Sequence, residues 1–474
     1  MRKTISRTPA IAFLLAALTT SLAIGAPPAG MGAAGAAAGA TPGGGMPAGR
    51  AADAAGGDMT SWDLTAGVTH SDNIALSPID RTSDSILQTG LQLQVADTRP
   101  RLDTRISADI SYWDFVNHSF KSQVVGGADA GLNFAIVPSR FSWSLHDNFG
   151  QLAVDPTAVV TPGNIQNVNL LSTGPTIALP LGSDVNTLVL QGLYSKADYG
   201  TTLQDNQQYL GSVALQHKLS ERTTVSLNGS DTHTVYDDSQ VGSSFDVREE
   251  SIGFDAIGVR TSLSSVLGYT ELRFLGQSHD GLLARLGLTR FIGSRSKLSL
   301  EIGTDYTDSA TQFAEGQQFR GVQTVPGVQG LQGSVSDAAV SIDPFKSDYA
   351  IGAWDLLGTR STLTFGFTLR SETHQQETQF DRRLGTATVT FTRHLSPLFV
   401  VSASGSYNRE RFSNLDVDLN TWILGAGLDW TLSRTLAVQT RFYRQDGSGI
   451  RAARNYTEDR AYIGISYSDG RRIR

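Results

Sequence analysis

One short stretch of the sequence contains residue types that could perform hydrolytic chemistry: Ser144, His146, Asp147 and Asn148. A serine activated by a histidine, with an acid or amide to orient the imidazole, is a common nucleophilic arrangement. The surrounding residues alternate between apolar and polar, as in a strand, and successive side chains of a strand point to opposite faces. Ser144 and His146 then share one face while Asp147 lies on the other, so the spacing does not imply a compact triad. We therefore predict that His146 is a polar wall residue and that the chain has no catalytic residues.

No stronger catalytic or metal-binding motif occurs elsewhere in the sequence. There is no phosphate-binding Gly-rich loop, no dinucleotide fingerprint, no GxSxG and no HExxH. The absence of cysteine excludes disulfides, thiolate metal sites and cysteine nucleophiles. The other histidines are scattered without the spacing of metal ligands, and they are His70, His118, His217, His233, His279, His374 and His394. The sequence predicts neither a cofactor nor a metal site.

The charge of the chain is acidic, with 38 Lys+Arg against 45 Asp+Glu in 474 residues and a formal net charge of -7. A nucleic-acid surface needs a basic stripe, so we expect no nucleic-acid partner. Two acidic stretches, Asp237-Asp238 and 414–418 (NLDVD), could collect the divalent cations that bridge lipopolysaccharide. Solvated acidic loops are the simpler interpretation of both stretches.

The elements that would position these side chains show a period of two. Between residues 61 and 467, apolar positions such as Leu363, Phe365, Phe367 and Leu369 alternate with polar residues or Gly, and helical spacing is sustained nowhere. Each strand would therefore have one apolar and one polar face. We expect about twenty strands, near 61–70, 85–96, 101–116, 123–136, 140–149, 168–181, 186–199, 207–219, 223–236, 247–258, 261–275, 281–292, 296–307, 345–357, 360–373, 381–395, 398–411, 421–432, 434–446 and 457–468.

The links between these strands alternate in length. Tight links such as 137–139 and 293–295 alternate with longer ones rich in Asp, Gly, Ser and Gln, such as 150–167 and 308–344. Short turns on one side and long loops on the other are typical of outer-membrane β-barrels. An even strand count places both ends of the strand region in the periplasm. A count of about 18 stays open, because boundaries taken from sequence shift by two to four residues.

The two faces of the strands favour a membrane barrel over a soluble β protein. In lipid, every backbone polar group must be paired within the protein, and a closed barrel achieves this without an edge strand. We therefore predict an all-β fold, a transmembrane antiparallel up-and-down β-barrel; a soluble sandwich, a propeller and a secreted adhesin are the alternatives. Aromatic residues near strand ends would form girdles at the lipid–water boundaries. They are Trp62, Tyr112, Trp113, Trp143, Phe149, Tyr194, Tyr306, Tyr407, Trp422, Trp430, Phe442 and Tyr467.

The first 60 residues differ from the rest in composition. Arg2, Lys3 and Arg7 precede an apolar stretch at 10–23, and small residues follow up to Gly25, the pattern of a cleaved signal peptide. Residues 26–60 are a low-complexity Ala/Gly/Pro linker that we expect to be disordered. The expected domains are a signal peptide (1–25), this linker (26–60) and an outer-membrane β-barrel (61–474). This organisation predicts export to the outer membrane of a Gram-negative bacterium.

Three stretches give the chain a resemblance to a known family. They are 71–76 (SDNIAL) after the first strand, 143–150 (WSLHDNFG) and 171–175 (LSTGP). In these stretches the sequence resembles the bacterial outer-membrane β-barrels found with exopolysaccharide and exosortase (PEP-CTERM) systems. The resemblance implies an export or anchoring barrel and supplies no catalytic residues. The last strand is similar to the closing strand of such proteins, although the polar tail at 468–474 replaces their usual terminal aromatic residue.

The polar face of the strands is the functional surface that the sequence can describe. Acidic and basic residues are interspersed on it, so they could pair across the interior or create a transverse field, and neither arrangement predicts strong ion selectivity. The candidate lumen-lining residues are Asp103, Arg105, Asp109, Asp129, Lys218, Arg285, Glu301, Asp305, Arg370, Glu372, Asp429 and Arg441. The long link 308–344 could fold inward and narrow the lumen, or lie outside as a cap.

These observations predict a porin-like passage for exopolysaccharide or other hydrophilic solutes, since Gln, Ser and Thr on the polar face suit sugar chains. One alternative is a non-conducting structural or adhesive barrel whose long outer loops bind glycans, and another is a barrel enzyme that uses Ser144 and His146. The expected partners are outer-membrane lipid, lipopolysaccharide and the barrel-insertion machinery, with polysaccharide or secretion components as further candidates.

Overall fold

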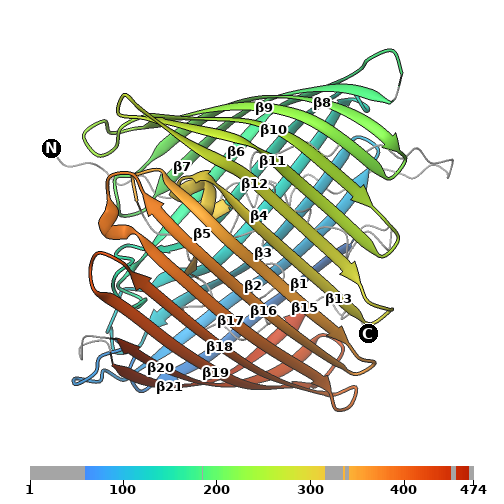
Figure 1. The fold of residues 1–474 in the computed structure, drawn as a ribbon. Coiled ribbons are helices and arrows are strands. Elements are labelled where there is room, and N and C mark those ends of the chain that lie inside the picture. Colours follow the sequence, from blue (N-terminus) through green and yellow to red (C-terminus); the bar gives the residue numbers. More distant parts are fainter. Residues whose placement is uncertain (1–58, 184, 315–334, 337–340, 450–454, 469–474) are drawn as a thin grey trace. The chain divides into compact units, whose positions relative to one another are not determined.

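The alternation of apolar and polar residues corresponds to long strands along almost the whole described chain (Figure 1). The computed structural model describes residues 59–183, 185–314, 335–336, 341–449 and 455–468. The expected signal peptide (1–25) and the expected linker up to residue 58 lie outside the described residues. Met59 and Thr60, assigned to the linker from sequence, instead begin the first strand.

Twenty long antiparallel strands form one closed sheet, which confirms the predicted fold class and strand count. Each strand pairs with the next one along the chain, and the last pairs with the first, so the sheet has no open edge strand. The strands are β1 (Met59–Ser71), β2 (Asp84–Arg99), β3 (Leu102–Phe115), β4 (Gln123–Val137), β5 (Phe141–Ala153), β6 (Ile165–Pro180), β7 (Asn186–Tyr199), β8 (Asn206–Ser220), β9 (Thr223–Tyr236), β10 (Phe245–Ile257), β11 (Thr261–Phe274), β12 (Gln277–Phe291), β13 (Ser296–Thr307), β15 (Phe345–Leu357), β16 (Ser361–His374), β17 (Arg382–His394), β18 (Phe399–Phe412), β19 (Val417–Thr431), β20 (Leu436–Gly449) and β21 (Tyr456–Ser468).

Three short elements interrupt this pattern. Residues 309–314 are helical, β14 (Val335–Ser336) is a two-residue strand, and η2 (Thr378–Phe380) is a single 3-10 turn. Within the described ranges, no helix has the length and hydropathy needed to cross a bilayer. Two of the three elements belong to the link 308–344, so this link contains structure that the sequence pattern did not predict.

The predicted strand bounds agree with the observed ones to within four residues, and β12 shows why some differ. Its start was expected at residue 281, but it begins at Gln277, because Leu275 and Gly276 form a two-residue hairpin with φ values of 52° and 76°. Positive φ at both central residues suits the twist of a tight hairpin. A leucine rarely adopts this conformation, so nothing in the sequence marked the turn.

One face of the sheet carries an exposed apolar band. On β19 this face presents Trp422, Leu424, Ala426, Leu428 and Trp430. Trp422 is 54% exposed, Leu424 is 55% exposed and Trp430 is 45% exposed. Eight residues at about 3.4 Å span about 27 Å along the strand, or about 20 Å along the axis of a barrel with the usual tilt. The band therefore has roughly the height of the apolar zone of an outer-membrane barrel, and we call this surface the outer face.

Aromatic side chains border the outer-face band on both sides. One belt lies toward the long links and contains Tyr194, Tyr209, Tyr269, Tyr407 and Trp422, whereas Phe442, expected in a girdle, lies opposite Ala426 in the middle of the band. A second belt lies toward the short turns and contains Trp62, Trp143, Trp354, Trp430 and Tyr467. Trp113 was expected in a girdle, and this prediction is wrong: it is 2% exposed and packs with Phe115 and Ile86 on the opposite face. Trp113 is an odd-numbered residue of β3, and the odd-numbered positions of this strand are those of its polar residues, such as Arg105 and Asp109.

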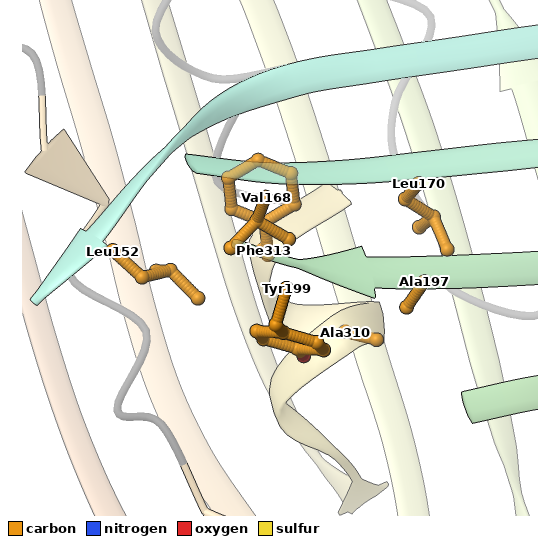
Figure 2. Close-up of a cluster of buried hydrophobic side chains, with 7 residues drawn as sticks. All are labelled: Leu152, Val168, Leu170, Ala197, Tyr199, Ala310 and Phe313. Carbon is orange, nitrogen blue, oxygen red and sulfur yellow. The ribbon is translucent and has the colours of Figure 1, made fainter. Parts of the chain in front are cut away.

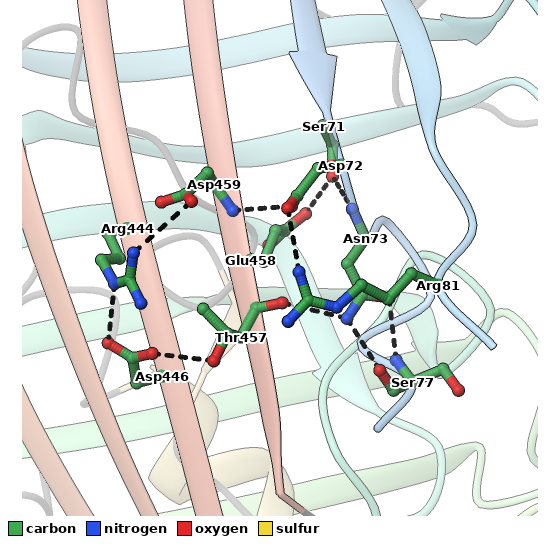
Figure 3. Close-up of polar contacts among 10 residues, drawn as sticks. All are labelled: Ser71, Asp72, Asn73, Ser77, Arg81, Arg444, Asp446, Thr457, Glu458 and Asp459. Carbon is green, nitrogen blue, oxygen red and sulfur yellow. Dashed lines mark hydrogen bonds and ion pairs between the residues drawn. The ribbon is translucent and has the colours of Figure 1, made fainter. Parts of the chain in front are cut away.

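Polar contacts reinforce the seam at which the barrel closes between β1 and β21 (Figure 3). The Asn73 side chain donates to the carbonyl oxygens of Ser77 at 2.8 Å and Thr457 at 3.0 Å. The backbone N–H of Asp459 donates to the Asp72 carboxylate at 2.8 Å. These bonds fix the β1–β2 link against the last strand, so the first and last parts of the barrel hold each other in register.

Candidate functional site

A segment of the link between β13 and β15 lies inside the ring of strands. Ala310 and Phe313 pack in a buried apolar cluster with side chains of β5, β6 and β7 (Figure 2). In the same helical segment, Gln312 Nε2 donates to Glu372 Oε1 on β16 at 2.6 Å. β6 and β16 are far apart around the ring, so a segment that contacts both must lie within it. The face that carries Leu170 and Glu372 is therefore the inner face of the barrel.

Three further contacts hold this internal segment. Gln208 Nε2 on β8 donates to both oxygens of Asp308 at 3.1 Å, and Tyr236 on β9 donates to the Ile342 carbonyl at 2.8 Å. β14 pairs in parallel with β5, with Val335 opposite Gln151. Burial raises the pKa of the Asp308 carboxyl, and hydrogen bonds from Thr311 and its neighbours offset only part of that effect. The segment is thus fastened to several walls of the barrel.

The internal segment bridges a narrow part of the interior. A circular barrel of twenty strands at the usual tilt would measure about 40 Å between opposite backbones. A helical turn with its side chains is about 10–12 Å across. Because one turn at 309–314 reaches both Leu170 and Glu372, the cross-section at this level is flattened rather than circular. The link 308–344 was left open between an inward and an outward position, and its described parts lie inward.

Other long links also cover the inner face at this end. Ile74, Phe120 and Val160, from three different links, pack with Trp113 and Phe115 in a second buried cluster. Some inner-face residues at this end, such as Trp113 and Phe115, are therefore apolar because they pack against links. Because apolar residues replace polar ones at these contacts, strict alternation of apolar and polar residues fails near the ends of β2, β3 and β6.

The register places the twelve candidate lumen-lining residues on the inner face. Residues paired directly across an antiparallel ladder share a face, and Asp305, Ser347, Glu372 and Arg382 form one such continuous row. Following the pairs around the sheet brings all twelve to the side that carries Gln208. Whether they line an open passage belongs to the functional proposal below.

Five of the twelve gather on one wall, formed by β10 to β18. Arg285 lies between two carboxylates, 2.8 Å from Asp305 and 3.2 Å from Glu249. Tyr349 donates to Glu301 at 3.1 Å, and the Arg370 guanidinium lies 6.0 Å above the Tyr349 ring. These contacts leave the middle of the wall with acids and bases side by side.

The same wall continues with a buried ion-pair triad. Arg382 lies 2.5 Å from both Glu372 and Glu410, and the side chains of Arg382 and Glu372 are 4% and 1% exposed. A guanidinium with two carboxylates satisfies charges that would be costly to bury alone. Gln312 donates to the Glu372 member of this triad, so the internal segment is docked on a buried ion-pair network.

The other candidates are spread over separate parts of the inner face. Asp109 accepts from Gln92 at 3.3 Å. Arg105 pairs with Asp103 of the same strand at 3.4 Å, whereas His146–Asp129 at 2.6 Å and Arg441–Asp429 at 2.6 Å join neighbouring strands. Lys218 lies near the short turns and has no ion pair among the described residues. The structure therefore brings together the residues of β12 to β16 but does not unite all twelve in one site.

The stretch that could have formed a hydrolase site has a different arrangement. Ser144 donates to the carbonyl of Gly174 at 3.2 Å, and His146 bonds Asp129 rather than Ser144. Asp147 lies on the outer face, where it accepts from Asn169 at 2.9 Å. No serine–histidine hydrogen bond connects the pair, so their geometry gives no support to nucleophilic catalysis.

Sequence reasoning missed several members of the inner wall. Glu249, Tyr349, Arg382 and Glu410 complete the clusters above, and all four follow the same alternation as the predicted residues. Continuing the strand parity to both ends of β10, β15, β17 and β18 would have found them. In the described part of the chain, no group of His, Asp and Glu is arranged to hold a metal ion, and Asp418 of the acidic stretch pairs with Arg409 at 2.9 Å.

Comparisons with known proteins find only distant structural likenesses. No protein-family model matches the sequence, and no curated protein matches it. Among solved structures, a ferric enterobactin receptor of Pseudomonas aeruginosa has a TM-score of 0.44 at 11% identity, covering 87% of this chain and 81% of that one. A siderophore receptor of Acinetobacter baumannii has a TM-score of 0.38 at 10% identity, with 87% and 82% covered. Pseudomonas aeruginosa OccK2 (OpdF) in complex with glucuronate has a TM-score of 0.35 at 9% identity, with 87% and 98% covered. These distant likenesses say nothing about what this chain binds or transports.

Proposed function

We propose that the barrel spans the outer membrane of a Gram-negative bacterium and forms a porin-like passage for hydrophilic solutes, narrowed from within by the described parts of the link between β13 and β15, residues 308–314, 335–336 and 341–344. The apolar band of the outer face and its two aromatic belts support the membrane placement. The observation that carries the passage proposal is the internal segment. It is docked on the wall through Gln208, Glu372, Tyr236 and one small apolar cluster, and apart from the two-residue pairing of β14 with β5 its described residues lie outside the barrel sheet.

The chemistry of the inner wall suits neutral, hydroxyl-rich solutes. Its acidic and basic residues are interspersed, as Arg285 is between Glu249 and Asp305, and such mixing does not favour strong ion selectivity. Many other inner side chains are hydroxyls and amides, which both donate to and accept from sugar hydroxyls. They include Gln88, Gln92, Gln94, Ser212, Ser230, Thr386, Thr388 and Ser404. We extend the proposal to polysaccharide chains of the exopolysaccharide class, as the sequence resemblance implies.

Single-channel recording in planar bilayers tests the passage with a matched pair of variants. Gln208→Ala removes the side chain that holds Asp308, whereas Gln207→Ala removes its neighbour on the outer face. We expect larger or more frequent openings for Gln208→Ala and unchanged recordings for Gln207→Ala. A protein without any conductance steps in all three forms, with or without added oligosaccharide, would contradict the passage.

A deletion provides the stronger form of this test. Thr307 lies opposite Phe345 in the register, so a short Gly/Ser turn could join β13 to β15 after removal of residues 309–342. If the link narrows the lumen, the deleted protein should conduct more than the complete one. Equal conductance would show that the link does not restrict the passage.

A non-conducting structural or surface-binding barrel is the second candidate function. The observation that favours it is the second apolar cluster, in which Ile74, Phe120 and Val160 close further area at the long-link end. Under this alternative, both the complete chain and the deletion would be silent in bilayers. Retention on immobilised glycans that is lost when the long links are shortened would then support it.

A further inference from the structure

The short turns of the barrel carry a regular set of arginines. Seven of these turns contain one arginine each. Arg101, in the β2–β3 turn, follows the ion-paired Arg99 by two residues, and we call the other six the short-turn arginines: Arg140, Arg222, Arg260, Arg295, Arg360 and Arg434. The turns connect β4–β5, β8–β9, β10–β11, β12–β13, β15–β16 and β19–β20, so the set is spread around the rim. All six side chains belong to exposed residues. The only acidic residue in the same six turns is Glu221.

The two ends of the barrel treat their basic residues differently. Within the described ranges, none of the short-turn arginines has an ion-pair partner. At the long-link end, by contrast, most basic side chains are paired with nearby acids, although Arg383 and Arg411 on the outer face have no ion pair among the described residues. Six of these pairs, which we call the paired set, are Arg81–Asp72, Lys196–Asp198, Arg248–Asp231, Arg273–Glu271, Arg409–Asp418 and Arg444–Asp446. Unpaired positive charge therefore concentrates at the short-turn rim of a chain whose net charge is negative.

The short-turn arginines lie just beyond the second aromatic belt. Arg434 follows Trp430 by four residues, and Arg140 precedes Trp143 by three. Two further arginines at this end project from the outer face itself. Arg290 has the parity of the exposed Leu286 on β12, and Arg393 has the parity of the exposed Val389 on β17. Indole rings at the boundary and guanidiniums immediately outside it match the levels of acyl chains and phosphates in a lipid leaflet.

We propose that the short-turn arginines form a phosphate-binding rim that takes the headgroups of anionic phospholipids in the periplasmic leaflet. Each guanidinium offers donors in the fork geometry that suits a phosphate. The proposal rests on the membrane placement given under the proposed function but not on conduction. It assigns this rim a lipid partner that fixes the depth and orientation of the barrel.

The alternative partner, an anionic polymer entering the lumen, fits the observations less well. The inner face near this rim mixes Asp103, Asp255 and Asp355 with Lys218 and Lys297, so the mouth itself is not a basic funnel. The unpaired arginines lie in turns all around the circumference, as surrounding lipids do. A polymer threading the centre would need its basic contacts on the inner wall.

Selective lipid binding by two charge-matched variants tests the proposal. One variant changes all six short-turn arginines to Gln, and the control changes the six bases of the paired set to Gln, so both lose the same charge. Each full-length protein is reconstituted in phosphatidylcholine vesicles that contain brominated phosphatidylglycerol. Quenching of Trp143, Trp354 and Trp430, which lie in the belt next to the rim, then reports the preference for the anionic lipid.

We expect the preference for phosphatidylglycerol to fall about fivefold in the short-turn variant, the ratio that one basic side chain contributes at an anionic surface. The control should keep the preference of the unchanged protein. Equal preference in all three proteins, or an equal fall in both variants, would overturn the proposal. Both variants must first show the heat-modifiable migration of a folded barrel, and a set of three changes per end replaces the six if folding fails.

Two further measurements separate this proposal from its neighbours. If the short-turn variant loses retention of soluble polygalacturonate while keeping its phosphatidylglycerol preference, the rim binds a polymer and the lipid assignment is wrong. Bilayer conductance of the short-turn variant should equal that of the unchanged protein, because these turns lie outside the proposed constriction. A silent channel with intact lipid selectivity would contradict only the proposed passage.

Discussion

Truncation of Phe313 offers the most direct test of the internal segment. Its side chain is fully buried in the cluster with Leu170, Ala197 and Tyr199. Removing a buried phenylalanine ring costs about 3–5 kcal/mol. If the segment can leave the wall while the barrel stays folded, this cost falls on the docked state alone. Because about 1.4 kcal/mol is a factor of ten, even the lower value raises the ratio of undocked to docked segment about a hundredfold.

Single-channel recording of Phe313→Ala measures this shift as open probability. We expect wide openings to become about a hundredfold more frequent, up to the limit of a continuously open channel. Phe115→Ala is the control, since Phe115 is 1% exposed on the same inner face but belongs to a separate cluster. A correctly folded Phe313→Ala protein with unchanged recordings would refute the idea that the segment restricts the passage. An equal increase in both variants would indicate a generally loosened barrel.

Three other changes have expected outcomes that follow from the structure. Burial raises the pKa of Asp308 above its ordinary 3.8, so the docked segment binds a proton more tightly than the undocked one. Docking should therefore strengthen, and open probability fall, as the pH is lowered through the raised pKa. Asp308→Asn should abolish this pH dependence of open probability. Arg382→Met leaves two buried carboxylates without their cation and should cost about 3–5 kcal/mol in urea unfolding, whereas Arg409→Met, at an exposed pair, should cost under about 1 kcal/mol. Gly126→Ala places a Cβ 2.0 Å from a backbone oxygen at φ +126° and should sharply reduce the heat-modifiable folded fraction, while Gly211→Ala, with open space around it, should not.

The sequence was sufficient for the barrel because its strands obey a simple physical rule. Lipid outside and water inside impose opposite demands on successive side chains, so Leu363, Phe365 and Phe367 reveal their face without any knowledge of their neighbours. The same parity brought all twelve candidate residues to one face. What alternation cannot show is the partner of each charge, since the pairing of Arg382 with Glu410 depends on the register between strands.

The interior segment escaped prediction for a related reason. Val168 and Leu170 are apolar on the inner face, which looks like a failure of alternation until Phe313 is placed against them. A contact between residues so far apart in the chain leaves no periodic trace in either segment. Trp113 was assigned to a girdle for the same reason, because an aromatic residue near a strand end fits a lipid boundary and a buried interior cluster equally well.

The seam between β1 and β21 also determines the order in which this molecule can assemble. Ser71 and Glu458, which hydrogen-bond across it, are separated by 387 positions, whereas every other neighbouring pair among the twenty long strands is also consecutive along the polypeptide. Hairpins can form locally while the chain is still arriving, but the seam has to wait for the final strand, and the entropy of closing so long a loop is lost only then. Until that moment β1 is a bare template for any other extended chain. A chaperone that shields this first strand, and releases it only to the last one, would protect the nascent molecule when it is most prone to aggregate.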